Sequence, residues 1–192
     1  TLRLIRAGGK VSPELRLPIV ELALPSLRRM SSEQARLFLD NLIVLIKANK
    51  NVSLFKWCLY KIVSLSIEEY FGNPASRGKG ISDLQTVAID CRVVISSLVK
   101  ATRHVGLEPS EVYVAAIKEL QCPAIETSQP EVFSLSALDR SLKVLRCLNP
   151  QPKSRLLKAC IASVLADGRI DPVEAELLRV IAATLRVPMP PF

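Results

Sequence analysis

The chain has 192 residues, 49% of them hydrophobic, and a formal net charge of +8 at pH 7. This length and apolar content suit one globular domain or two small fused domains, and they argue against a disordered chain. No apolar run reaches the roughly 18 residues that a membrane-spanning helix needs, because charges such as Lys47 and Asp90 interrupt each candidate. We therefore expect a soluble chain with a substantial core.

Apolar residues recur mainly at three- and four-residue intervals, which is the period of amphipathic helices, and no alternating strand pattern stands out. The predicted fold is all-α, a bundle of about eight helices. The first helix is expected to be interrupted near Pro18 and Pro25. The predicted helices span residues 13–29, 32–48, 54–71, 82–104, 109–120, 136–148, 151–166 and 172–186.

Helix-capping residues, prolines and glycines define the ends of the predicted helices. Ser31 with Gln34, and Ser82 with Gln85, have the Ser-x-x-Gln spacing of a capping box, in which the hydroxyl satisfies a free amide at the helix start. Pro13, Pro109 and Pro172 suit first-turn positions, and Gly72, Gly106 and Gly168 suit helix ends. Turn-rich connections at 72–80 and 121–132 then divide the chain. The predicted regions are a basic linker (1–14), a first helical half (15–80), central helices (81–132) and a second helical half (133–192).

An internal repeat relates the two halves. Placing Ala48 on Ala166 aligns residues 26–63 with residues 144–181 without gaps, at an offset of 166 − 48 = 118. Identical pairs are Leu27/Leu145, Arg28/Arg146, Leu39/Leu157, Ile43/Ile161, Ala48/Ala166 and Leu59/Leu177. Because these pairs share one helical register, the sequence predicts two structurally related halves.

The second copy contains a short acidic turn between two predicted helices. Gly168 suits the end of one helix, while Asp171, Pro172 and Glu174 suit the cap, first and third positions of the next. The alternative is a divalent-cation site at Asp167, Asp171 and Glu174, since hard cations prefer carboxylate oxygens. The spacing is too short for an EF-hand loop, so capping is the favoured interpretation.

The corresponding turn in the first copy has lost this charge. Asn49, Ser53 and Lys56 replace the three carboxylates. A turn and a serine cap remain, whereas a cation would find no carboxylate. This comparison weakens the metal interpretation of the turn.

Catalytic motifs are absent from the sequence. Its single histidine, His104, cannot supply the His-Glu-x-x-His pair of a zinc peptidase, and we expect it at a helix C-terminus. The glycine-rich segment 72–80 lacks the spacing and the final Ser or Thr of a phosphate-binding loop. Five scattered cysteines form no metal-binding or disulfide pattern, so we expect buried thiols. The sequence predicts neither an enzyme nor a cofactor for these residues.

Positive charge leaves anionic partners open. Two basic helical faces, formed by Arg140, Lys143 and Arg146 and by Lys153, Arg155 and Lys158, are expected to be solvated faces. The alternatives are contact with lipid head groups or with nucleic acid. Only nine aromatic residues occur, without a stacking platform, and this disfavours nucleic acid.

Two motifs suggest a family. The stretch 166–178, Ala-Asp-Gly-Arg-Ile-Asp-Pro-Val-Glu-Ala-Glu-Leu-Leu, resembles the helical turn of tellurite-resistance TerB-like domains, which are helical bundles with related halves. Together with 17–27 and 187–191, it looks like the C-terminal region of bacterial membrane-anchored zinc metalloendopeptidases. Their peptidase part is similar to the HtpX and CAAX-prenyl-protease families.

This resemblance implies a noncatalytic regulatory or protein-interaction domain within a longer membrane protease, with zinc bound in the peptidase part. Because the sequence starts at Thr1 without a signal peptide, we expect an excised piece of such a protein. Its partner would be another protein or the rest of the same chain. Arg3, Arg6 and Lys10 fit the cytoplasmic side of a bacterial inner membrane, where anionic lipids attract basic residues. The sequence specifies no oligomeric state.

Overall fold

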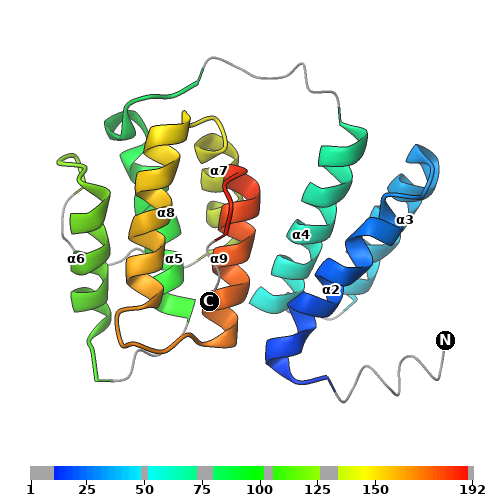
Figure 1. Cartoon of the computed structure of the whole chain (residues 1–192), viewed down its shortest axis with the longest axis horizontal. Helices are drawn as coiled ribbons and strands as arrows, with labels where there is room; N and C mark the ends of the chain where they lie inside the picture. The colour runs from blue at the N-terminus through cyan, green and yellow to red at the C-terminus, as the bar shows by residue number, and fades with distance from the viewer. Residues whose placement is uncertain (1–10, 49–51, 73–79, 102–105, 126–133, 190–192) are drawn as a thin grey trace. The chain divides into compact units, whose positions relative to one another are not determined.

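The computed structural model describes residues 11–48, 52–72, 80–101, 106–125 and 134–189 (Figure 1). Across these ranges the chain forms eight α-helices and one short 3-10 helix, and its only strand-like pairing is an isolated bridge between Ile81 and Leu148. The predicted all-α fold is confirmed. None of the described helices is both long and apolar enough to cross a membrane.

Two compact units make up the chain, residues 1–72 and residues 73–192. The division falls at Gly72, whereas the predicted first half extends to residue 80. The central helices and the second half, predicted as separate regions, belong to one unit. Residues 1–10 of the predicted basic linker (1–14), residues 73–79 of the predicted connection (72–80) and His104 lie outside the described residues, and α2 begins at Pro13, inside the predicted linker.

The described residues of the first unit form three helices, α2 (Pro13–Leu27), α3 (Ser32–Lys47) and α4 (Leu54–Phe71). Helix α4 packs against both α2 and α3. Their shared core consists of buried Ala35, Val63 and Ile67 and the partly buried Val20, Leu24, Leu27, Met30, Phe38, Leu39, Leu42 and Leu59. Arg28 Nε also donates to Ser66 Oγ at 3.3 Å, which links α2 to α4.

Helix α2 corrects one prediction, because it is continuous through Pro18 and Pro25. Each proline removes one main-chain hydrogen bond, yet its fixed φ angle suits a helix. Packing of Val20, Leu24 and Leu27 against the α4 side of the core compensates for the missing bonds. Downstream, the Ser31 capping box is confirmed, since Ser31 Oγ accepts from the Gln34 amide at 3.2 Å and Gln34 Oε1 accepts from the Ser31 amide at 2.9 Å.

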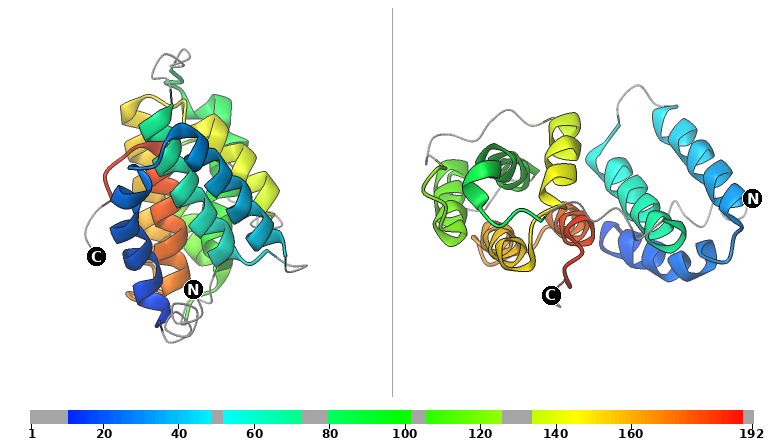
Figure 2. Two further views of the ribbon diagram at one scale, coloured as in Figure 1. Left: turned by 90° about the vertical axis from the view of Figure 1, so that its right-hand side faces the viewer. Right: turned by 90° about the horizontal axis from the view of Figure 1, so that it is seen from above.

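In the second unit, the part of the chain that the structure describes forms six helical segments: the 3-10 helix η1 (Leu84–Val87), α5 (Ala88–Ala101), α6 (Pro109–Leu120), α7 (Leu135–Leu145), α8 (Pro150–Val164) and α9 (Pro172–Leu185). Helix α5 lies among the other four α-helices and packs against each of them, as the right-hand view of Figure 2 shows. Its buried face consists of Cys91, Val94, Ile95, Leu98 and Val99. Helix α5 is therefore the central helix of this unit.

The start of α5 differs from the sequence prediction. Asp83, not Ser82, caps the segment, because Asp83 Oδ1 accepts from the Gln85 amide at 2.9 Å and a 3-10 turn follows. Ser82 Oγ instead accepts from Asn149 Nδ2 at 2.6 Å, and the Ile81 amide and carbonyl bond to the α7–α8 turn. The Ser82 capping-box prediction was wrong because this tertiary pairing competes for the hydroxyl.

Helices α7–α9 repeat helices α2–α4. Helix α3 begins at Ser32 and α8 at Pro150, while α4 begins at Leu54 and α9 at Pro172. Both pairs are separated by the sequence offset (150 − 32 = 118; 172 − 54 = 118). Helix α9 also packs against both α7 and α8, as α4 packs against α2 and α3. The sequence repeat therefore corresponds to a three-helix structural repeat, and α5 and α6 are additions found with the second copy.

Candidate functional site

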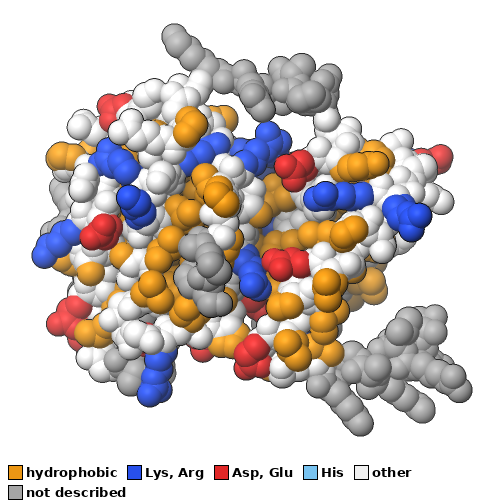
Figure 3. All heavy atoms as spheres, in the orientation of Figure 1, with side chains coloured by type: hydrophobic (Ala, Val, Ile, Leu, Met, Phe, Trp, Pro, Cys, Tyr) orange, Lys and Arg blue, Asp and Glu red, His pale blue; other side chains and the backbone are white. Residues whose placement is uncertain are grey.

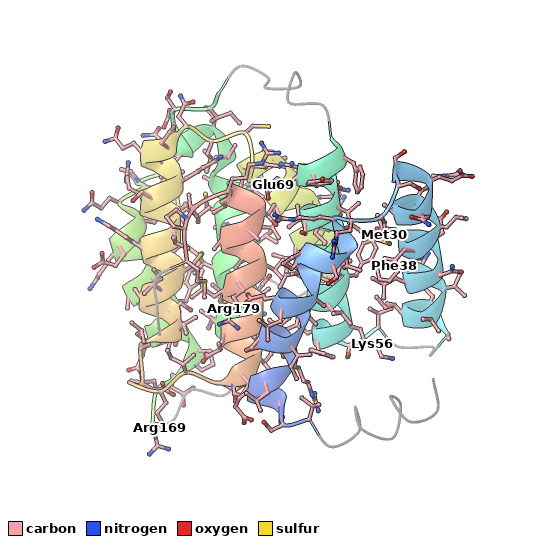
Figure 4. All side chains as sticks on the ribbon, turned by 45° about the vertical axis from the view of Figure 1, so that its right-hand side comes forward. Met30, Phe38, Lys56, Glu69, Arg169 and Arg179 are labelled. Carbon is pink, nitrogen blue, oxygen red and sulfur yellow. The ribbon has the colours of Figure 1, made fainter. Side chains whose placement is uncertain are left out.

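The acidic turn joins α8 to α9 and brings Asp167, Asp171 and Glu174 into one short segment. Gly168 has a φ angle of +73°, which reverses the chain after α8 and which favours glycine. Asp167 Oδ1 accepts from the Arg169 amide at 3.0 Å and so closes the turn. The Arg169 side chain projects away from the bundle in Figure 4.

Asp171 and Glu174 form a reciprocal capping box at the start of α9. Asp171 Oδ1 accepts from the Val173 amide at 2.8 Å, and Glu174 Oε2 accepts from the Asp171 amide at 3.0 Å. Glu174 is buried, although its side chain is polar. All three carboxylates thus accept main-chain hydrogen bonds, as the capping interpretation predicts.

A divalent cation at this turn remains a prediction. Among the described residues, no group of three or more His, Cys, Asp or Glu side chains is arranged to hold a metal ion. A cation at Asp171 or Glu174 would compete with the amides that these carboxylates already accept. In the first copy, Ser53 Oγ accepts from the Lys56 amide at 3.4 Å, so the cap is retained there without any carboxylate.

Two residues of the predicted basic faces, Arg155 and Lys143, form polar contacts within the second unit. Arg155 Nη2 donates to the Leu120 carbonyl at 2.6 Å and also to the Gln121 carbonyl, so this side chain caps the C-terminus of α6. Lys143 forms an ion pair with Asp139 at 2.9 Å. The prediction of a solvated face is therefore wrong for Arg155, because the free carbonyls at the end of α6 attract its charge. Anion binding by the remaining residues stays a prediction.

Four of the five cysteines are buried thiols, as predicted, and Cys147 is the exposed exception. Burial raises the pKa of Cys91 to about 12, with smaller effects from nearby Cys122 and Asp90. Burial also raises the pKa of Cys160, and Cys91 contributes to the same direction. Burial therefore favours the protonated form of both thiols at neutral pH, which lowers their nucleophilicity.

The sequence did not predict a surface in the first unit where large apolar side chains are exposed. Nine of the twelve exposed large apolar side chains belong to this unit, which is the smaller one: Leu15, Ile19, Leu22, Leu37, Val44, Leu45, Val52, Tyr70 and Phe71. Orange side chains on the right-hand part of Figure 3 show apolar surface on this unit. Exposed apolar side chains are typical of interaction sites where they form a contiguous patch.

Residues of α3 can be compared with the residues of α8 that lie 118 positions later in the sequence. Leu45 on α3 is 69% exposed, whereas its counterpart on α8, Ser163, is fully buried. Asn41 is exposed while Ala159 is buried, and Leu37 is exposed where Arg155 caps α6. The signal was present in the sequence, since Leu37 and Leu45 are apolar where the second copy has Arg and Ser.

No protein-family model, curated protein or solved structure matches this chain. The class that the described residues define is an all-α protein, in which α2–α4 and α7–α9 share their helix order, the start offset of 118 between α3 and α8 and between α4 and α9, and packing on the third helix. One copy is covered by two further helices of the same chain, and the described residues of the other copy contain no such cover.

Proposed function

We propose that this chain is a noncatalytic protein-interaction domain, which recruits a partner to a membrane-associated zinc metalloendopeptidase or regulates it. The observation that carries the interaction role is the set of large apolar side chains exposed on the first unit, which includes Leu45 where the second unit has the buried Ser163. The protease context comes from the resemblance of the acidic turn and of both ends of the chain. TerB-like relatedness is part of the same proposal, supported by the structural repeat.

The protease context is tested first by the coding sequence upstream of Thr1. A helix with a His-Glu-x-x-His motif and hydrophobic spans there would support it. A short leader without either feature would contradict the protease context while leaving the interaction role open.

Regulation is tested in the longer protein by exchanging Leu45 for Glu on the exposed surface. The expected result is altered substrate choice, complex size or proteolytic rate, with unchanged zinc content, because the apolar side chain of Leu45 cannot ligate zinc. Leu165→Glu is the matched control, since Leu165 is also an exposed leucine but belongs to the second unit. Unchanged behaviour in all three readouts would contradict regulation through this surface.

A further inference from the structure

Helix α2 carries large apolar side chains on two opposite faces. One face packs against the core of the first unit through residues that include Val20 and Leu24. The other consists of Leu15, Ile19 and Leu22, which follow the i, i+4, i+7 spacing of one line along a helix and are 55%, 48% and 81% exposed. Successive residues are about 100° apart around a helix, so Leu22 lies opposite Val20 and Leu24. We name Leu15, Ile19 and Leu22 the α2 outer stripe.

Positive charge is concentrated in the same part of the sequence. Three Lys or Arg residues occur within residues 1–10, before α2, and Arg28 and Arg29 follow the helix. Residues 1–29 contain six Lys or Arg and two Glu, a net charge of 6 − 2 = +4, which is half of the +8 on the whole chain. One short segment thus combines exposed apolar side chains with most of the positive charge of its unit.

The charged residues of α2 lie beside the α2 outer stripe and not within it. Glu14 and Glu21 directly precede two of its leucines, so each lies about 100° around the helix from the stripe. Arg16 lies 5.2 Å from the centroid of the Phe55 ring, which holds its charge toward α4. No other residue of α2 is charged. In Figure 3, orange side chains follow the course that α2 takes in Figure 1.

We infer that the α2 outer stripe docks on the surface of an anionic lipid bilayer. Its three apolar side chains enter the boundary between head groups and acyl chains, and the positive charge of residues 1–29 is attracted to the anionic head groups. This lipid contact goes beyond the proposed recruitment of a protein and does not require the protease. It also uses α2, whereas the test of recruitment uses Leu45 on α3.

A bilayer fits the α2 outer stripe better than a protein surface does. The stripe protrudes from one helix, and a fluid bilayer can deform around such a ridge. A stable protein interface instead needs complementary shape over roughly 800 Å² per partner, which three side chains do not supply. A second copy of this chain fits less well, because pairing two stripes would bring together two segments of charge +4.

The test is flotation of the full chain with vesicles of phosphatidylcholine alone or of phosphatidylcholine and phosphatidylserine in equal amounts. We expect binding to the mixed vesicles that weakens as salt is raised, because salt screens the attraction to the head groups. Leu22→Glu should lower this affinity by about tenfold or more, since an apolar contact is replaced by a charge that anionic lipid repels. Arg29→Gln should lower it by about fivefold through loss of one positive charge.

Two matched controls separate the α2 outer stripe from the rest of the surface. Leu45→Glu changes the net charge as Leu22→Glu does, at an exposed leucine of α3, and should retain binding to the mixed vesicles. Arg169→Gln removes an exposed arginine of the second unit and should leave the affinity unchanged. Circular dichroism should show the same melting temperature for all four variants, because each replaced side chain is exposed.

Four outcomes would overturn the inference. These are no binding to the mixed vesicles, equal binding to both kinds of vesicle, equal losses for Leu22→Glu and Leu45→Glu, and a lipid-free dimer in sedimentation that Leu22→Glu dissociates. Should Leu22→Glu fail to fold, equal affinity of wild type and Arg29→Gln for the mixed vesicles overturns it instead. Vesicle binding without any effect of Leu45→Glu on the longer protein would retain this inference and reject the proposed function.

Discussion

The two copies of the three-helix unit share a framework but differ in what surrounds it. In α7–α9 the core leucines at 138, 142 and 145 are fully buried, and α5 packs against all three helices. In α2–α4 the equivalent Val20, Leu24 and Leu27 are partly buried. The equivalent helices therefore start at equivalent positions, while these leucines are fully buried only in the copy that also packs against α5.

The largest contrast is expected at Leu45 and Ser163, which occupy equivalent positions. Ser163→Glu should lower the free energy of unfolding of the second unit by roughly 3 kcal/mol or more, because a carboxylate would be buried without a partner. Leu45→Glu should change the stability of the first unit by no more than about 0.5 kcal/mol, since the side chain is exposed. Urea unfolding, followed by circular dichroism and by the fluorescence of Trp57 in α4, measures both. Equal losses of unfolding free energy for Ser163→Glu and Leu45→Glu would contradict the difference in burial between the two copies.

A second contrast concerns truncation of equivalent core leucines. Leu142→Ala should cost about 2–5 kcal/mol, as expected for a fully buried leucine that leaves a cavity. Leu24→Ala should cost less than about 2 kcal/mol, because part of its side chain already contacts solvent. Trp57 fluorescence reports the first unit and amide NMR signals of α7–α9 report the second. A larger loss for Leu24→Ala would mean that the first unit is covered in solution.

The charged cap on α6 is a smaller difference between the copies. Arg155→Ala should cost about 1.5–3 kcal/mol, because two carbonyls at the end of α6 lose a charged donor. Leu37→Ala at the equivalent position should change stability by about 0.5 kcal/mol or less. Both values come from denaturant unfolding. An Arg155→Ala effect as small as that of Leu37→Ala would show that the two bonds contribute nothing to the second unit.

The smallest difference in stability between the copies is expected at the N-caps of α4 and α9, Ser53 and Asp171. Asp171→Ala and Ser53→Ala should each cost about 1 kcal/mol through loss of one capping bond. Asp171→Asn should retain that stability, since asparagine also caps helices. Calcium or magnesium titration of wild type and Asp171→Asn separates capping from ion binding. A saturable stabilisation by either ion that Asp171→Asn abolishes would favour the cation site.

Local sequence signals predicted the helices well because they depend on neighbouring residues. The capping box at Ser31, the first-turn prolines and Gly168 all lie where the sequence places them. The predictions for Ser82 and Arg155 were wrong, because contacts distant in sequence decide both. The Ser82 hydroxyl accepts from Asn149, and Arg155 donates to carbonyls at the end of α6. The exposed apolar side chains of the first unit were also missed, because an apolar pattern does not reveal whether another element covers it.

The most direct test of the central claim compares the solvent accessibility of one equivalent pair, Asn41 and Ala159. Each is replaced by cysteine in a chain carrying Cys147→Ser, which removes the exposed native thiol. Maleimide labelling of native protein should be rapid for Asn41→Cys, and Ala159→Cys should label only in denaturant, because Ala159 is fully buried. Protection of Asn41→Cys as strong as that of Ala159→Cys would contradict an uncovered first copy.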